Sequence, residues 1–380
     1  MTGYIRKRKT SSGVSYQVVL ETSNASSGRR KRIYKTFSNK PEAEAFKTKS
    51  IADYNTGRFL EPNKITVEEL CLEWMKGHFI LIKESTQRGY RVNIESHIIP
   101  HIGDIEVQKL SASHIQTMVN SMHEKGLAPR SIKYVITNLN QILNYAISND
   151  IIIKNPTRSV ILPRQEKFQH EVYSLDEVKK LIHCSKGTKL EEIIAIEVFT
   201  GLRRGEVLAL NWEDINFEEK TLTIRRNLIH EDNGIQFTTP KTQAGTRTIV
   251  VPNELIIYLE RLKNKRIRQR LRAGKNYNNL DLIVCKENGE PYDPRMVSIW
   301  FREFLDSNNL KRIRFHDLRH THATLLLVEY GTSIKAISDR LGHSKVQTTM
   351  DYYISSTDSA QQEAIGKLEK DLMSLGALTG

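Results

Sequence analysis

Two helix-start signals constrain the organisation of this chain more than any other feature of its sequence. Thr66-Val67-Glu68-Glu69 and Ser174-Leu175-Asp176-Glu177 each have the form of a capping box, in which a hydroxyl and a glutamate bind free amide groups at a helix N-terminus. Each follows a polar stretch marked by proline, at Pro62 and at Pro163. Because 380 residues are more than one hydrophobic core usually serves, we predict three domains, comprising residues 1–60, 64–160 and 171–380.

The charge of the chain indicates a polyanionic partner. The formal net charge is +13, and residues 1–60 alone contain 13 lysines and arginines against four acidic residues. Such an excess is typical of proteins that bind nucleic acid. No apolar run approaches the roughly 18 residues that span a bilayer, and the N-terminal MTGYIRKRKT lacks the apolar centre of a signal peptide. We therefore expect a cytoplasmic, nucleoid-associated protein that binds double-stranded DNA and no membrane.

The first sixty residues have the pattern of a small sheet followed by a helix. Polar and apolar residues alternate over Tyr16–Leu20 and Arg32–Phe37, on either side of a Ser/Gly turn, which predicts a small three-stranded antiparallel sheet. A helix from about Pro41 to Tyr54 follows. A basic β-ribbon of this kind fits into a DNA groove, whereas the alternative is a solvated basic tail. The residues expected to contact DNA are Arg6, Lys7, Arg8, Lys9, Arg29, Arg30, Lys31 and Arg32.

The second domain has a helical pattern throughout. We predict helices over Val67–Leu81, Ser85–Ile98, Ser111–Lys125 and Pro129–Asn149, separated by glycine-containing breaks. Four helices of this length form one bundle. Most lysines and arginines on a helix surface contact only water, but four on this bundle are candidates for phosphate contacts: Arg88, Arg91, Arg130 and Lys133.

The third domain is helical with one interruption. Two β-branched runs, Leu222–Arg226 and Arg247–Val251, predict a strand hairpin or a small sheet. The chain as a whole is thus expected to be mainly α with small β elements, an α+β fold.

Five short stretches of the third domain place Arg, Lys, His and Tyr in turns or at helix ends, where such side chains can converge on a ligand. They are Thr200–Glu206 (TGLRRGE), Thr239–Thr242 (TPKT), His316–His322 (HDLRHTH), Leu341–Ser344 (LGHS) and Thr348–Tyr353 (TTMDYY). Each alone has an ordinary explanation: surface ion pairs for the arginines, an exposed lysine in a turn, structural roles for His320 and His322, and a core position for the tyrosine. Their combination indicates chemistry.

A metal site is the first alternative for a histidine-rich stretch. His316 and His320 stand four residues apart, like the histidines of an H-E-x-x-H zinc site. However, Leu318 and Arg319 lie between them, so the stretch has no glutamate base, and an arginine beside a divalent cation is unfavourable. The cysteines, Cys71, Cys184 and Cys285, form neither a disulfide framework nor a zinc pair and are expected to be buried thiols. We expect no metal and no other cofactor.

The combination of residue types suits metal-free phosphoryl transfer, because no carboxylate cluster accompanies it to hold magnesium. The forked guanidinium groups of Arg203 and Arg319 can bind the non-bridging oxygens of an attacked phosphodiester. A tyrosine, with an ordinary pKa of about 10, needs a base such as His316 to attack at neutral pH. Lys241 can protonate the departing sugar oxygen, and His343 can donate a hydrogen bond to the phosphate. The product is a covalent phosphotyrosine.

Read in order, TGLRRGE, PKT, HDLRH, LGHS and the final tyrosine resemble the signature of tyrosine recombinases of the phage-integrase family. The resemblance covers essentially the whole chain, because integrases of phages and conjugative transposons often have an N-terminal arm-binding domain, a helical core-binding domain and a mixed α/β catalytic domain. It implies that Glu206 supports the first arginine. It also implies the catalytic set Arg203, Lys241, His316, Arg319, His343 and one tyrosine.

Two adjacent tyrosines compete for the role of nucleophile. TTMDYY is similar to the TTxDxY form of many Gram-positive integrases, which selects Tyr353. The shorter interval found in other members would select Tyr352. Ser355 stands where many relatives have a histidine, which is not among the required groups.

The resemblance implies integration and excision of a mobile element through a 3′-phosphotyrosine and a four-way junction, without ATP. It implies arm-type and core-type attachment sites as DNA partners and a homotetramer on DNA, assisted in some members by an excision factor and a DNA-bending protein. Apolar residues at helical spacing predict a tail helix over 360–378, which would pack on a neighbouring protomer or on its own domain.

Two other functions remain open from the sequence. A type IB topoisomerase uses similar groups to nick and religate one duplex, although it has little need of a separate basic domain. A non-catalytic DNA-binding regulator would keep the fold but would form no covalent adduct. The sequence also leaves open whether the element is a phage or a conjugative transposon.

Overall fold

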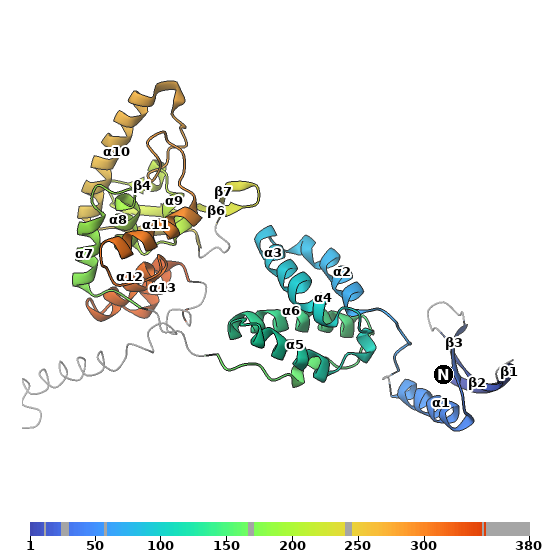
Figure 1. The fold of residues 1–380 in the computed structure, drawn as a ribbon. Coiled ribbons are helices and arrows are strands. Elements are labelled where there is room, and N and C mark those ends of the chain that lie inside the picture. The colour runs from blue at the N-terminus through green and yellow to red at the C-terminus, as the bar shows by residue number, and fades with distance from the viewer. Residues whose placement is uncertain are drawn as a thin grey trace, which may run out of the picture. The chain divides into compact units, whose positions relative to one another are not determined.

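The computed structural model describes residues 1–10, 13–23, 30–56, 59–165, 171–239, 245–343 and residue 346. The chain forms two compact units, Met1–Lys167 and Phe168–Gly380 (Figure 1). Within the described ranges no helix is both long and apolar enough to cross a membrane. The predicted tail helix lies outside them.

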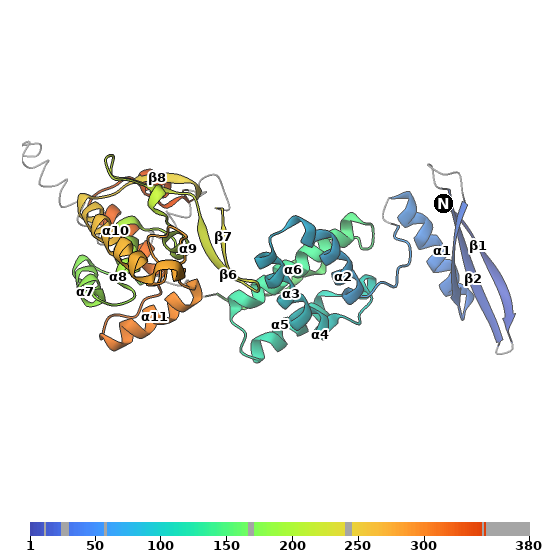
Figure 2. The same cartoon turned by 90° about the horizontal axis from the view of Figure 1, so that it is seen from above.

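A three-stranded antiparallel sheet and one helix form the N-terminal part. The strands β1 (Thr2–Thr10), β2 (Gly13–Ser23) and β3 (Arg30–Phe37) are arranged in the order β1-β2-β3. The helix α1 (Lys40–Asn55) lies along the sheet (Figure 2) and covers a small core that includes Val18, Leu20 and Ala43. Asn39 caps α1 by accepting a hydrogen bond from the amide of Glu42 at 2.9 Å. The predicted sheet and helix are confirmed.

A helical bundle with its own core follows. Its helices are α2 (Val67–His78), α3 (Glu84–Asn93), α4 (Ile99–Ile102), α5 (Ala112–Glu124) and α6 (Pro129–Ser148). The predicted capping box is present: Thr66 Oγ1 accepts from the amide of Glu69 at 3.2 Å, and Glu69 Oε2 accepts from the amide of Thr66 at 2.9 Å. The long helix expected up to Ile98 differs, because α3 ends at Asn93 and a π-helical turn, Ile94–Ile98, follows. Pro100 stands two residues after Ile98, and because it has no backbone N–H it cannot donate to an α-helical ladder.

The second unit encloses a large core between helices and a small sheet. Its helices are α7 (Leu175–Ser185), α8 (Glu191–Thr200), α9 (Arg204–Leu208), α10 (Asn253–Ala273), α11 (Pro294–Ser307), α12 (Asp317–Val328) and α13 (Ile334–Leu341). The strands β4 (Ile215–Asn216), β5 (Thr221–Ile224) and β8 (Arg247–Val250) pair in the order β4-β5-β8, with Leu222 opposite Ile249. The predicted pairing of the two β-branched runs is thus present.

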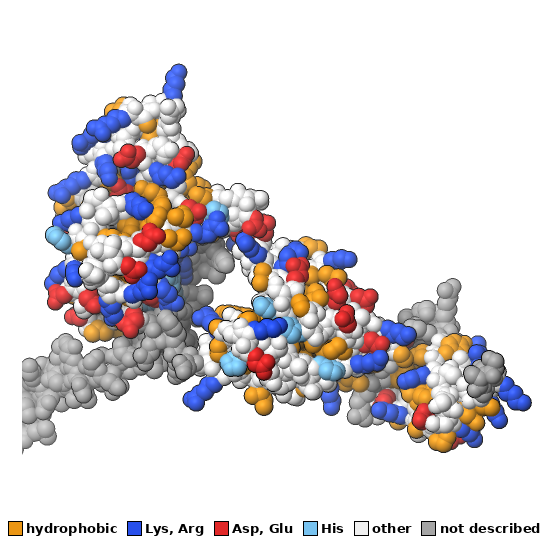
Figure 3. Space-filling view, viewed as in Figure 1, with side chains coloured by type: hydrophobic (Ala, Val, Ile, Leu, Met, Phe, Trp, Pro, Cys, Tyr) orange, Lys and Arg blue, Asp and Glu red, His pale blue; other side chains and the backbone are white. Residues whose placement is uncertain are grey.

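A second hairpin within the same unit was not predicted. β6 (Asn227–Glu231) and β7 (Gly234–Thr238) pair with each other only, and the turn between them consists of Asp232 and Asn233. Apart from Leu228, its apolar residues are at least partly exposed, so the hairpin has no clear inside and outside pattern. Lysine and arginine side chains project from the surface of each part of the chain, visibly along α10 (Figure 3).

Candidate active site

The turn after α8 determines where the first candidate arginine lies. Gly201 ends α8 with a φ of 65°, a left-handed conformation that favours glycine. A Cβ at this position would lie 2.5 Å from Cδ2 of His322, so the turn also needs a residue without a side chain. Two residues later Arg203 has an extended backbone and is the N-cap of α9. The glycine therefore allows the chain to reverse and present Arg203 at a helix start.

Arg203 is anchored by Glu206 and by the end of α13. Its Nη1 donates to Glu206 Oε1 at 2.8 Å, and its Nη2 donates to the carbonyl oxygen of Gly342 at 3.2 Å, 139 residues away. Glu206 is only 3% exposed, whereas the Arg203 side chain is 40% exposed. Burial alone would raise the pKa of Glu206, but hydrogen bonds and charges from Arg247 and Arg203 lower this pKa to about 2. The carboxylate is therefore ionised at every pH near neutrality.

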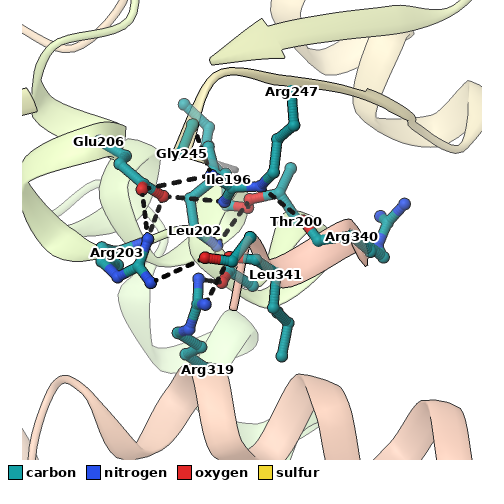
Figure 4. A network of polar contacts seen from close by, with 12 residues as sticks. Ile196, Thr200, Leu202, Arg203, Glu206, Gly245, Arg247, Arg319, Arg340 and Leu341 are labelled. Atoms are coloured by element: carbon teal, nitrogen blue, oxygen red, sulfur yellow. Dashed lines mark hydrogen bonds and ion pairs between the residues drawn. The ribbon is translucent and has the colours of Figure 1, made fainter. Parts of the chain in front are cut away.

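Arg319 lies in the interior, between two turns. It is 1% exposed, although it is only two residues into α12. Nη1 donates to the carbonyl oxygen of Gly201 at 2.8 Å, and Nη2 donates to that of Leu341 (Figure 4). Burial and the charge of Arg203 lower the pKa of Arg319 to about 9, so the group stays charged at pH 7. Arginine donors at the C-terminal carbonyls of α13 complement the negative end of that helix.

The two candidate histidines lie within the field of both arginines. His316 is the N-cap of α12, and His343 follows directly after α13, which ends at Gly342 in a left-handed conformation. Partial burial and the charges of Arg319 and Arg203 lower the pKa of His316 to about 4, and the same causes lower that of His343 to about 4. Without DNA both rings are neutral at pH 7, the state in which His316 can accept a proton. The structure thus brings Arg203, His316, Arg319 and His343 into one site.

A third histidine has a structural role. His322 Nδ1 lies 2.9 Å from the carbonyl oxygen of Val198, and its Nε2 lies 3.1 Å from Nε of Arg340. Because Arg340 can only donate, Nε2 must be the acceptor and Nδ1 must carry the proton. Burial and the charge of Arg340 lower the pKa of His322 to about 3.

This arrangement predicts loss of stability in acid. The folded-state pKa of His322 lies below its unfolded value of about 6.5, so the unfolded chain binds the proton more tightly and stability falls as the pH drops below 6.5. For this residue we expect a loss of about 2 kcal/mol between pH 7 and pH 5, at about 1.4 kcal/mol per pKa unit. Urea denaturation of wild type and His322→Gln at pH 5, 6 and 7 measures it. The variant should have a shallower pH dependence, and equal slopes would contradict the assignment.

Several predicted site residues lie outside the described residues: Arg29, Lys241, Tyr352, Tyr353 and Ser355. For Lys241 we expected the turn of a hairpin. The turn of the β6–β7 hairpin is Asp232–Asn233, and Lys241 follows β7 in the sequence.

The predicted DNA-contacting residues differ in whether their side chains form ion pairs or hydrogen bonds within the protein. Arg6, Lys7, Arg8 and Lys9 are exposed on β1, which is an edge strand. Arg32 forms an ion pair with Glu21 on the neighbouring strand at 2.7 Å. Of Arg30 and Lys31 the structure describes only the backbone, in β3. On the bundle Arg88, Arg91, Arg130 and Lys133 are exposed; Arg91 pairs with Glu95 at 3.4 Å and Arg130 donates to the hydroxyl of Tyr134 at 3.3 Å.

One arginine at the centre of the site was not predicted from the sequence. Arg247, at the start of β8, forms an ion pair with Glu206, and both side chains are less than a tenth exposed (Figure 4). Glu197, on α8, is fully buried, and neither of its carboxylate oxygens has a hydrogen-bond partner among the described residues. Burial raises the pKa of Glu197 well above its ordinary value despite the nearby Arg319. The only signal for Arg247 in the sequence was that an arginine stands at the first position of a β-branched run.

Among the described residues no three His, Cys, Asp or Glu side chains are grouped to hold a metal ion. Cys71 and Cys285 are buried free thiols, as expected, while Cys184 is half-buried.

Comparison with known proteins decides the family. The sequence profile of the phage integrase family matches residues 171–359, and that of the phage integrase N-terminal SAM-like domain matches residues 66–123. The chain belongs to the phage integrase family. It is a tyrosine-type site-specific recombinase, an enzyme that breaks and rejoins DNA strands. The predicted family is thereby confirmed.

Individual relatives are similar to this chain in sequence over most of its length. A "Tyrosine recombinase XerC-like" protein of Caldanaerobacter subterraneus subsp. tengcongensis is 28% identical, over 97% of this chain and 98% of its own length. The ICEBs1 integrase of Bacillus subtilis is 26% identical, over 90% and 93%. The fold is similar to that of the Tn1549 transposon integrase in complex with transposon right end DNA, with a TM-score of 0.69 at 22% identity over 80% of this chain and 99% of that one. A lambda integrase dimer bound to a core site gives 0.60 at 18% identity, over 91% and 93%.

Proposed function

We propose that this recombinase integrates and excises a mobile genetic element by exchanging strands between two DNA attachment sites. The strongest support is that side chains from three separate sequence motifs lie in one site. They are Arg203, His316, Arg319 and His343. Relatives named as the ICEBs1 integrase and as the integrase of Staphylococcus phage L54a support the mobile-element role.

Each side chain of the site has a separate role in strand cleavage. Arg203, which is partly exposed, binds a non-bridging oxygen of the scissile phosphate, and Arg319 contributes its charge and its remaining N–H donors. Neutral His316 accepts the phenolic proton of the nucleophile, and His343 donates a hydrogen bond to the same phosphate. The arginines supply the positive charge that a metal ion would otherwise supply, so the step is proposed to be metal-free.

Each transesterification conserves the energy of the broken bond. The Tyr353 hydroxyl oxygen attacks phosphorus, the bond to the 5′ oxygen breaks, and Lys241 gives that oxygen a proton. A 3′-phosphotyrosine results. The free 5′ hydroxyl of the partner strand then attacks phosphorus and releases the tyrosine, so that one strand exchange produces a four-way junction and a second resolves it.

The N-terminal sheet, the helical bundle and the second unit are proposed to act as arm-binding, core-binding and catalytic domains, over residues 1–60, 64–160 and 171–380. The exposed cations of β1 support DNA binding by the sheet. We propose a homotetramer on DNA, because lambda integrase was solved as a tetramer bound to a Holliday junction. An excision factor and a DNA-bending protein are proposed as accessory partners, and the DNA substrate locates the reaction at the bacterial chromosome.

A plasmid that carries two attachment sites of the element tests this function. We expect recombinant circles, four-way junctions and detergent-resistant protein–DNA adducts in EDTA and without ATP. Relaxed plasmid without joined products would indicate a type IB topoisomerase instead. Specific DNA binding without any adduct would indicate a non-catalytic regulator.

A further inference from the structure

We propose that Arg247 is a positioning residue for strand cleavage, which orients Arg203 through Glu206 and holds the end of α13 that leads into His343. The inference rests on the proposed role of Arg203 at the scissile phosphate. None of the five motifs singled out in the sequence contains Arg247.

The first support is the way in which one carboxylate is shared between two arginines. Arg247 Nη1 lies 3.3 Å from Glu206 Oε1, and Nη2 lies 2.9 Å from Oε2. Oε1 also accepts from Nη1 of Arg203 at 2.8 Å. The Arg247 side chain is 7% exposed and Glu206 is 3% exposed, whereas Arg203 is 40% exposed. Glu206 therefore has a buried inner arginine, Arg247, and a partly exposed outer arginine, Arg203. The outer arginine is positioned to contact a substrate.

The second support is a reciprocal connection between β8 and α13. Nε of Arg247 donates to the carbonyl oxygen of Arg340 at 2.7 Å (Figure 4). In return, Nη1 of Arg340 donates to the carbonyl oxygen of Val250 at 2.7 Å. These bonds join residues 93 and 90 positions apart. Because Gly342 and His343 come only two and three residues after Arg340, the same contact sets the position of the carbonyl that accepts from Arg203 and of the ring of His343.

Charge balance explains why the inner arginine matters. A buried carboxylate attracts the nearest cation strongly. With Arg247 in place, Glu206 is already neutralised from the inner side, so Arg203 keeps charge and donors for a phosphate. Without Arg247 the whole carboxylate charge would act on Arg203 and would draw its guanidinium group away from the DNA. Cleavage should then slow even though the DNA still binds.

The test uses full-length protein and a nicked suicide duplex that carries the core site. The single-turnover rate of covalent adduct formation is measured at saturating protein, together with the Kd for the same DNA and the Tm. The variants are Arg247→Met, Arg247→Lys, Glu206→Gln and the double variant Arg247→Met/Glu206→Gln. The control is Arg266→Met, which removes a buried arginine in the same unit. Arg266 pairs with Glu192 and donates to Ile283 and Gln269, none of which belongs to the Arg203–Glu206–Arg247 contacts.

Arg247→Met is expected to lower the cleavage rate by about 100-fold, the usual cost of misplacing one transition-state donor, with Kd changed less than about threefold. Arg247→Lys keeps the positive charge but lacks the forked guanidinium group, so its cleavage rate should lie between those of Arg247→Met and the wild type. The double variant should be no slower than the slower single variant, because both changes break one chain of contacts. Arg266→Met should lower the Tm but cleave at the wild-type rate.

Three results would overturn the inference: normal cleavage by folded Arg247→Met, a defect confined to Kd, or fully additive losses in the double variant. If Arg247→Met does not fold, Arg247→Lys and the double variant Arg247→Lys/Glu206→Gln take its place. The inference is then judged by the same three measurements: the cleavage rate, the Kd and the additivity of the losses. Failure of the proposed function is distinct, since wild type itself would then form no adduct or Arg203→Lys would cleave normally.

Discussion

Tyr353→Phe is expected to abolish covalent attachment to DNA while leaving DNA affinity unchanged. The substitution keeps the aromatic ring and removes only the hydroxyl oxygen that attacks phosphorus. Wild-type protein on a nicked duplex with its core site should form an adduct that survives detergent, and peptide mass spectrometry should place the phosphate on Tyr353. The variant should form none.

Tyr352→Phe is the matched control, because it makes the same change one residue earlier. We expect it to retain the adduct. If the phosphate maps to Tyr352 and Tyr353→Phe remains active, the reaction stands but the nucleophile is assigned to the wrong residue of the pair.

Arg203→Lys should lower the rate of strand cleavage by about 100- to 1,000-fold, the range found when one transition-state donor is removed. Lysine preserves the positive charge but cannot bind Glu206, the carbonyl oxygen of Gly342 and a phosphate oxygen with one planar fork. The loss should appear in the single-turnover rate at saturating protein, with little change in Kd, because the lost bond strengthens mainly in the transition state.

Arg204→Lys provides the control for this prediction in the adjacent residue. Arg204 donates to Oγ of Ser298 on α11. Among the described residues its side chain forms no hydrogen bond or ion pair with Glu206 or Gly342. Its cleavage rate at saturating protein should remain within about threefold of wild type, as for most changes outside a site. Equal losses in both variants would mean that the TGLRRGE turn as a whole was disturbed.

Local signals allowed much of the fold to be predicted. The capping boxes at Thr66 and Ser174 were recognisable because each involves residues only three positions apart, and both are present in the structure. The antiparallel N-terminal strands followed from alternation, and the bundle helices from their apolar spacing. The π-helical turn before Ile99 was not predictable in the same way, because the apolar pattern continues through it unchanged.

The hairpin β6–β7 was missed for a related reason. It has almost no buried face, so its strands lack the alternation that marks a half-buried strand. Two candidate groups, Arg203 and His343, were recognisable because glycines that permit left-handed turns accompany them in short motifs.

The sequence by itself determined the helix starts at Thr66 and Ser174, the N-terminal sheet, the family and the candidate reactive groups, because all of these depend on neighbouring residues or on the order of motifs. Only the tertiary structure decided the electrostatics of the site. Arg319 is buried between carbonyl groups 118 positions before it and 22 positions after it. The pKa of His316 is low because folding desolvates the ring and brings two guanidinium groups near it. The role of Arg247 could not be predicted from the sequence, because it depends on the contact with Glu206, 41 residues earlier. Contacts between residues so far apart in the chain leave no periodic pattern in the sequence.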